Sequence, residues 1–344
     1  MLPDPRLVDL ITKAVAQAPS SKGPLGVAVS GGVDSSMLAV HACYWARAHG
    51  VTLHLFHVHH GLQDAADQWQ HRVHDLAHQL QVPCHSIRIS IESKGGKGVE
   101  AAAREGRYRA LAQLADKVQV SHLLLGHHQN DQAETVLLRL LRGAGPHGLA
   151  AMSPVSTRGD LCLIRPWLDV PRKTLEAVAD EYAAQTGWYP VADPSNHQDH
   201  YTRSALRGRL VPELDERWPA WRANVVRHAR QSAQAREILQ EVALNDFDTL
   251  EPSADKTSFA LARWRALSPA RQSHVLRYWL QFHGLPMPSE ARLNELIKQL
   301  RNLHALGHDR HMRLRHAGHI ISCEKGRVCL QGAVFLQGVG KTGC

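Results

Sequence analysis

The sequence contains no Cys-x-x-Cys pair, and its six cysteines are spread along the chain: Cys43, Cys84, Cys162, Cys323, Cys329 and Cys344. This spacing argues against a zinc ribbon, an iron–sulfur site or a disulfide framework, and it favours a reducing compartment. A run of about 18 apolar residues that would cross a membrane is also absent. The N-terminus carries Asp4 and Asp9 and has no apolar signal-peptide segment. We therefore expect a cytoplasmic protein without a membrane partner.

Acidic residues are scarce relative to basic ones. The 344 residues include 40 Lys and Arg against 32 Asp and Glu, which leaves a formal net charge of +8. This balance suggests a polyanionic partner, although a solubilising surface would give the same charge. The apolar fraction of 44% is ordinary for a globular protein, and the length allows two domains with a substantial core.

A short apolar run that breaks into two glycines is the clearest candidate for an anion site. The run Leu25–Val29 has the length of a strand and is followed by Ser30, Gly31, Gly32, Val33, Asp34, Ser35 and Ser36. Glycines let backbone N–H groups point at a ligand, and the helix that follows presents its positive end there. The serines add hydroxyl donors, and Asp34 has the chemistry to hold a magnesium ion that bridges phosphates.

Missing residues separate this turn from two common nucleotide motifs. The Walker motif needs a Lys after its last glycine, and the dinucleotide fingerprint needs a third glycine at a fixed spacing. Neither residue is present here. An ordinary tight turn between a strand and a helix has the same pattern, so the surrounding residues must decide.

Apolar periodicity predicts alternating strands and helices in the N-terminal part of the chain. The expected strands are Leu25–Val29, Val51–Val58, Val82–Ile91, Ser121–Leu125 and Leu161–Leu168; the expected helices are Leu7–Gln17, Met37–His49, Asp64–Gln81, Val99–Val118, Asp131–Arg142 and Pro171–Thr186. This order predicts an α/β fold, a Rossmann-like parallel sheet with helices on both faces. Such sheets bind ligands at the carboxyl ends of their strands.

Polar side chains follow these strands: His57, His59, Arg104, His127, Asp131 and Glu134. We expect them to converge on one edge of the sheet. Each also has a purely structural interpretation. Asp131 and Glu134 have the spacing of a helix capping box, and Arg104 has Glu100 within reach for a structural ion pair. Because the chain holds 24 histidines, hydrogen-bonded or surface roles are favoured over metal binding for these histidines.

The composition changes after the turn-like segment Asp193-Pro194-Ser195-Asn196. Arginines then predominate, and a long helix expected over 216–245 interleaves them with tryptophans. Such a helix either tracks a nucleic-acid backbone or packs its tryptophans inward as a connector. Helices after Ser268 and Ser289 and short basic strands within 311–331 follow. We expect a catalytic domain over 1–215, a mainly helical C-terminal domain over 216–331 that ends in a small basic β segment, and a loose tail over 332–344.

With these residues in place, the chain resembles the tRNA(Ile)-lysidine synthetase family of the PP-loop ATP pyrophosphatases. The resemblance rests on the glycine turn and on segments that occur in the family's order: His57–Leu62, Gly126–Thr135, Leu141–Gly143, Arg165–Leu168 and Asp193–Asn196, followed by Arg203 and Arg207. Gln63, Asn130 and Ser204 depart from the family's usual residues, and none of them is a candidate catalytic residue. The chain resembles the family's short form.

The resemblance implies a two-step reaction, in which ATP adenylates the wobble cytidine of a CAU-anticodon isoleucine tRNA and free L-lysine then displaces AMP. It assigns ATP to the turn Ser30–Ser36 and to His57, with Mg²⁺ on Asp34. Catalysis is assigned to Asp34, Arg104 and Asp131, and lysine binding to His127, Asp131 and Glu134. Contacts to tRNA are expected from Arg203, Arg207 and Arg222. The short form also implies a homodimer.

Three alternatives remain open at this point. A tRNA thiolase of the same superfamily also adenylates a base, but such enzymes generally need reactive cysteines. A small-molecule synthetase of the superfamily would not need the basic C-terminal half. A non-catalytic ATP- and tRNA-binding protein would not need the set Asp34, Arg104 and Asp131.

Overall fold

The computed structural model of the chain describes residues 3–21, 23–59, 61, 66–89, 99–191, 202–303 and 312–332. The family segment 193–196, residues 60, 62 and 63, and the expected tail from 333 onward lie outside the described residues. The chain forms two compact units, Met1–Ala233 and Gln234–Cys344, and the division falls within helix α10 (Trp221–Asp248). No helix in the described ranges is long and apolar enough to cross a membrane.

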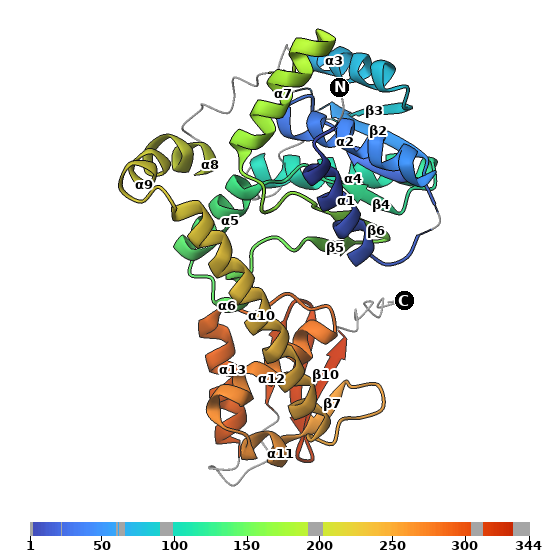
Figure 1. Cartoon of the computed structure of the whole chain (residues 1–344). Coiled ribbons are helices and arrows are strands. Elements are labelled where there is room, and N and C mark those ends of the chain that lie inside the picture. The colour runs from blue at the N-terminus through green and yellow to red at the C-terminus, as the bar shows by residue number, and fades with distance from the viewer. Residues whose placement is uncertain are drawn as a thin grey trace, which may run out of the picture. The chain divides into compact units, whose positions relative to one another are not determined.

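The first unit is built on a six-stranded sheet with the order β3-β2-β1-β4-β6-β5 (Figure 1). Its strands are β1 (Leu25–Ala28), β2 (Leu53–His59), β3 (Cys84–Arg88), β4 (His122–Leu124), β5 (Val155–Arg158) and β6 (Leu161–Ile164). All neighbours pair in parallel except β5, which runs antiparallel to β6 at the edge. The chain builds to one side of β1 first and then to the other, so the topological switch point lies between β1 and β4.

Helices cover both faces of this sheet because its strands are apolar on both sides. One face packs against α1 (Pro5–Gln17), α2 (Val33–His49), α3 (Ala66–Leu80) and α7 (Arg172–Thr186) through residues such as Val27 and Leu124. The opposite face packs against α4 (Val99–Lys117) through residues such as Phe56 and Leu123. The predicted α/β class, with a mostly parallel sheet, is confirmed.

Glycines fix both ends of α2. The helix begins at Val33, immediately after Gly32 and four residues earlier than periodicity predicts, so the glycine turn leads straight into its first turn. It ends at Gly50, which adopts the left-handed conformation with φ of 64° expected of a glycine C-cap. The early start places the N-terminal N–H groups of α2 next to the end of β1.

The remaining helices of the first unit are α5 (Gln129–Leu141), α6 (Pro146–Leu149), α8 (Thr202–Ala205), the π-helical turn η2 (Leu206–Leu210) and α9 (Val211–Arg217). A single helix was expected from 216 onward. The chain instead leaves α9 at Trp218, and α10 starts at Trp221, since Pro219 cannot continue a helix.

The second unit combines helices with a small antiparallel sheet of order β7-β10-β9-β8. Its elements are β7 (Ser258–Ala260), α11 (Leu261–Ala266), α12 (Pro269–Phe282), α13 (Glu290–Asn302), β8 (Arg313–His316), β9 (His319–Glu324) and β10 (Arg327–Gly332). Ser268 and Ser289 cap α12 and α13 as predicted. The core is formed around Phe259, Trp264 and Trp279, all fully buried. Strands β5 and β7 are not predicted from sequence because neither contains an apolar run: β5 reads Val-Ser-Thr-Arg and β7 reads Ser-Phe-Ala.

Candidate active site

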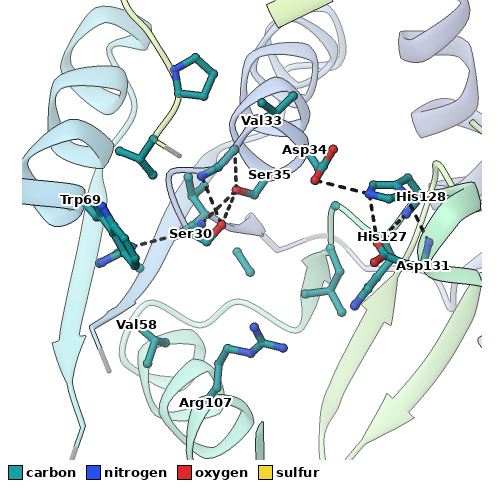
Figure 2. Close-up of a pocket in the computed structure, with 18 of the residues that line it drawn as sticks. Ser30, Val33, Asp34, Ser35, Val58, Trp69, Arg107, His127, His128 and Asp131 are labelled. Atoms are coloured by element: carbon teal, nitrogen blue, oxygen red, sulfur yellow. Dashed lines mark hydrogen bonds and ion pairs between the residues drawn. The ribbon is translucent and has the colours of Figure 1, made fainter. Parts of the chain in front are cut away.

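A cavity of about 1180 Å³ lies at the carboxyl end of the sheet in the first unit (Figure 2). Its walls come from the ends of β1, β2 and β4, from the first turns of α2 and α5, and from α3, α4, α7 and the α8–η2 segment. The cavity therefore occupies the switch point between β1 and β4, where α/β sheets bind ligands. The predicted convergence at this edge is observed for five residues, which all line the cavity: His57, His59, Arg104, His127 and Asp131.

The glycine turn is held in shape by its own serines. Ser35 Oγ donates to the carbonyl of Gly32 (3.2 Å) and accepts the backbone N–H of Ser30 (3.1 Å). Gly31 has a φ of +95°, and a Cβ there would lie 2.9 Å from Val191 Cγ2, so only glycine fits. Gly32 provides no side-chain cap for α2, and the first N–H groups of that helix are left for a ligand.

Asp34 presents one free carboxylate oxygen. Its Oδ2 lies 3.5 Å from His128 Nε2, whereas its Oδ1 is buried without a hydrogen-bond partner. The close approach of the two segments depends on Gly126, since a Cβ at that position would lie 3.1 Å from the backbone carbonyl of Asp34. A buried carboxylate oxygen without a partner is a donor suited to a hard cation.

The capping box of α5 is formed by His128 and Asp131. The backbone N–H of His128 donates to Asp131 Oδ2 (3.2 Å), and the N–H of Asp131 donates to His128 Nδ1 (3.4 Å). The prediction that Asp131 and Glu134 form the capping box is therefore wrong. The box lies three residues earlier, with His128 at the N-cap and Asp131 at position N3. Asp131 still reaches the cavity, and Figure 2 shows it beside His127 and His128.

His127 and Asp131 differ in charge. Burial, reinforced by the positive charges of Arg165, Arg107 and Arg104, lowers the pKa of His127 to about 3, although Asp131 opposes this shift. Burial raises the pKa of the Asp131 carboxyl, but the neighbouring His128, His127 and Arg203 lower it more, so the pKa ends below its ordinary value. At neutral pH the site thus contains an ionised carboxylate next to a neutral imidazole, whose Nδ1 is buried without a partner.

Glu134 does not line the cavity. It is buried, and its two oxygens accept hydrogen bonds from Arg207 Nε (2.7 Å) and Nη2 (2.9 Å). Arg203 Nε lies 3.3 Å from the same carboxylate, and Arg207 also lies 3.5 Å from Asp131 Oδ1. Arg203 and Arg207 both line the cavity, so this acidic residue anchors two cations at its wall.

Arg104 and Arg107 enter the cavity from the same face of α4, beside Tyr108. Arg104 Nη2 donates to the Tyr108 hydroxyl (3.3 Å), and its guanidinium lies 5.2 Å from the centre of the tyrosine ring. Arg107 lies 5.8 Å from the same ring, and Figure 2 shows it pointing into the cavity. The side chain of Glu100, the structural partner considered for Arg104, is outside the described side chains.

The other predicted site residues fall in different places. His57 lines the cavity and donates through Nδ1 to the carbonyl of Val29 (2.9 Å); burial lowers its pKa. Ser36 is fully buried behind the first turn of α2 and does not line the cavity. Arg222 is away from the cavity lining, paired with Asp215 and stacked over Trp221 at 4.7 Å.

Several lining side chains are absent from the sequence-based predictions, among them Trp69, Arg107, Arg172 and Tyr189. Arg107 had a usable signal, because it follows Arg104 by three residues and therefore shares its face of α4. The others reach the cavity through tertiary packing, which local spacing does not encode. In the ranges that the structure covers, no group of three or more His, Cys, Asp or Glu side chains could hold a metal ion.

Comparisons with known proteins agree with this geometry. Residues 5–214 match the family model of the PP-loop domain, and residues 259–329 match that of the TilS substrate binding domain. The tRNA(Ile)-lysidine synthase of Bordetella bronchiseptica is 55% identical over 334 residues, which cover 95% of this chain and 97% of the relative. That of Ralstonia nicotianae is 41% identical over 285 residues, which cover 82% of this chain and 60% of the relative.

Among solved structures, a U34-tRNA thiolase from Methanococcus maripaludis is similar with a TM-score of 0.53 and 12% identity, covering 66% of this chain and 77% of that chain. This likeness supports the fold alone. The family models and the relatives go further: the chain belongs to the tRNA(Ile)-lysidine synthase family, with an ATP-binding PP-loop domain followed by a TilS substrate binding domain.

Proposed function

We propose that the chain ligates lysine to carbon 2 of the wobble cytidine in an isoleucine tRNA with a CAU anticodon. In the first step the carbon-2 oxygen attacks the α-phosphate of ATP, and pyrophosphate leaves. In the second step the ε-amine of lysine attacks carbon 2, and AMP leaves with that oxygen. The observation that carries this proposal is the placement of Asp131 and His127 in the same cavity as the glycine turn.

The glycine turn and α4 have complementary tasks in the adenylation step. The N–H groups after Gly32 and the serine hydroxyls suit the pyrophosphate, which is the leaving group. Arg104 and Arg107 face the cavity from α4, where they would offset negative charge that develops at the α-phosphate. His57, held through Nδ1 by Val29, would face the nucleotide with its other ring nitrogen.

Asp34 fits the role of magnesium ligand, because its Oδ1 is buried without a protein partner at the edge of the phosphate site. Bound Mg²⁺ supplies charge neutralisation for the pyrophosphate. Asp34 itself contributes a carboxylate oxygen from within the first turn of α2.

The lysine step needs a residue that attracts the ε-ammonium and then takes a proton from it. Ionised Asp131 provides the attraction, and neutral His127 accepts an N–H without opposing the positive charge. The ammonium must first lose one proton to solvent, because only the free amine has a lone pair with which to attack carbon 2. As the new C–N bond forms, the nitrogen becomes acidic, so even a weak base such as Asp131 suffices as acceptor of its second proton. The predicted lysine contact of Glu134 requires that Arg207 first release this carboxylate.

Arg203 and Arg207 are proposed to contact tRNA phosphates at the wall of the cavity, with Glu134 as their anchor. Arg222, held by Asp215, is proposed as a more distant phosphate contact. We also propose that the chain forms a homodimer, as the family's short form implies.

One assay tests the function against its alternatives. AMP release is measured with ATP, a CAU-anticodon isoleucine tRNA transcript, and either lysine, a sulfur donor or no acceptor. Lysine-dependent release is expected. Release that depends on sulfur would make the chain a thiolase, although no cysteine is among the described residues that line the cavity. Binding of ATP and tRNA without any release would make it a non-catalytic binding protein.

A further inference from the structure

His128 touches both acidic groups of the site through one ring nitrogen. Its Nε2 lies 3.5 Å from Asp34 Oδ2 and 3.4 Å from Asp131 Oδ2. Figure 2 shows the ring between these two carboxylates, and only 2% of the residue is exposed. In the function proposed above, Asp34 serves the nucleotide and Asp131 serves the lysine.

We propose that His128 is a positioning residue that fixes the Asp34 carboxylate for the nucleotide and ties it to Asp131; this inference rests on the roles proposed above for these two residues. The ring can do so while neutral. Since Nδ1 accepts the backbone N–H of Asp131, the proton of a neutral ring sits on Nε2, which faces both carboxylates. Holding Oδ2 of Asp34 leaves Oδ1, the oxygen without a partner, directed to the ligand.

A helix-capping role alone does not account for a histidine here. The residues preferred at an N-cap are Ser, Thr, Asp, Asn and Gly, each of which accepts from the helix N–H groups with a short side chain or leaves them open. His128 caps α5 with Nδ1. Its other ring nitrogen, Nε2, lies 3.5 Å from Asp34. The contacts of Nε2 are longer than the about 2.8 Å of a full charge-assisted bond, as is common before substrates bind.

The substitution His128→Asn separates the two roles. Asparagine is a good N-cap, so its Oδ1 replaces Nδ1 at the start of α5, whereas nothing replaces Nε2. We expect the thermal midpoint to stay within a few degrees of the parent protein. We also expect Mg²⁺-dependent binding of the non-hydrolysable ATP analogue AMPCPP, measured by calorimetry, to weaken about 10- to 100-fold, the usual effect of removing a group that orients a metal ligand.

Binding of AMPCPP without Mg²⁺ should change little in His128→Asn, because the glycine turn is intact. His122→Asn, at a buried histidine of β4 that bonds Pro19 and Ser121 instead, is the matched control and should leave Mg²⁺ dependence unchanged. His128→Gln, whose amide nitrogen reaches as far as Nε2, should restore part of the Mg²⁺ dependence even where it lowers the thermal midpoint.

The inference is overturned by an Asn variant that binds Mg²⁺ and AMPCPP as tightly as the parent protein, since His128 would then be only a cap. A Gln variant no better than Asn would overturn it as well. The readout is binding, so failure here is distinguishable from failure of the lysine-dependent AMP assay. A parent protein that binds AMPCPP without any Mg²⁺ effect would contradict both the role of Asp34 and this inference.

Discussion

Arg207 holds Glu134 with a two-point contact, Nε to Oε1 at 2.7 Å and Nη2 to Oε2 at 2.9 Å, although the residues are 73 positions apart. Burial lowers the pKa of Arg207, but its hydrogen bond to Glu134 and the charges of Glu134 and Asp131 raise it overall, so the guanidinium stays charged. The contact joins η2 to α5, the helix that carries Asp131. It is thus one of the links that set the wall of the cavity.

Glu134→Gln should destabilise the first unit, because the substitution removes the charge that compensates a largely buried guanidinium. Breaking a buried ion pair from one side costs about 3–5 kcal/mol, and partial exposure of Arg207 places this case near the lower end. Urea unfolding gives the value. Arg230→Gln, which breaks the exposed pair with Asp169, should cost less than about 1 kcal/mol. Equal losses of unfolding free energy in the two variants would mean that the buried pair stabilises the fold no more than an exposed one.

Arg203→Gln should weaken tRNA binding and make it less sensitive to salt. A cation that neutralises one phosphate contributes about 0.7–0.9 to the slope of log affinity against log salt concentration. Binding of the CAU-anticodon transcript, titrated at several salt concentrations, measures that slope. Arg6→Gln, which removes an exposed cation on α1 paired with Asp4, is the control. A slope unchanged from the parent protein would exclude a phosphate contact for Arg203.

Local sequence patterns predict those parts of the site that local structure determines. The run before Ser30 has the apolar character of a strand, and Gly31 after it has a conformation and a close contact that side chains exclude, so the turn can be predicted from sequence. The α/β class follows from periodicity in the same way. Strands β5 and β7 are missed because they lack the apolar run that marks the equally short β1, β4 and β6.

Glu134 shows where such patterns stop. Its spacing from Asp131 is that of a capping box, and the family resemblance assigns its carboxylate to lysine binding. The capping partner is His128 instead, and Arg207 occupies the carboxylate from 73 residues away. The first fact depends on where α5 begins, and the second depends on how η2 and α5 meet in the folded chain. Trp69 and Tyr189 likewise reach the cavity only through tertiary packing, whereas Arg107 could have been predicted from its spacing of three residues from Arg104.

Tyr108→Phe should reduce adenylation without unfolding the protein. The substitution keeps the ring against which Arg104 lies at 5.2 Å, and it removes the hydroxyl, which accepts from Arg104 Nη2 and also bonds Arg165. Losing one hydrogen bond to a charged group costs about 1.5–3 kcal/mol, so we expect kcat for AMP release to fall about 10- to 100-fold with the KM for ATP little changed. Steady-state kinetics with varied ATP measures both constants.

Tyr182→Phe is the matched control for Tyr108→Phe. Tyr182 is similarly buried, but its hydroxyl donates to Gln79 on α3, away from the cavity lining. It should leave kcat unchanged. A Tyr108→Phe variant with normal kcat would show that Arg104 needs only the ring.

Gly126→Ala should abolish nucleotide binding. The added methyl group would lie 3.1 Å from the backbone of Asp34 and of Ser35, and backbone atoms cannot move aside as a flexible side chain can. Either β4 or the first turn of α2 must shift, which opens the phosphate site. Calorimetric titration with AMPCPP measures the loss. Gly332→Ala, where the methyl group meets nothing within 4 Å, should bind normally. Normal affinity in Gly126→Ala would disprove the close packing of these segments.

His41 should make the stability of the first unit dependent on pH. The residue is fully buried in α2; its Nδ1 donates to the carbonyl of Met37 (2.7 Å), and its Nε2 accepts the N–H of Asp4 (3.2 Å). Burial lowers its pKa, against smaller opposite effects of Met37 and Asp4. Both ring nitrogens are therefore satisfied in the neutral form, and a second ring proton would point at an N–H donor.

The lowered pKa of His41 makes the folded chain less stable as the pH falls. Above about pH 6.5 His41 is neutral in the folded and unfolded chains, so it contributes no slope. Below that pH the unfolded chain binds the proton first, and stability decreases by up to about 1.4 kcal/mol per pH unit until the folded histidine also titrates. His41→Gln should remove this part of the loss between pH 6.5 and 5.5 in urea unfolding, whereas His228→Gln, at an exposed position, should not. An unaltered pH slope in His41→Gln would mean that the folded chain accommodates the charged ring.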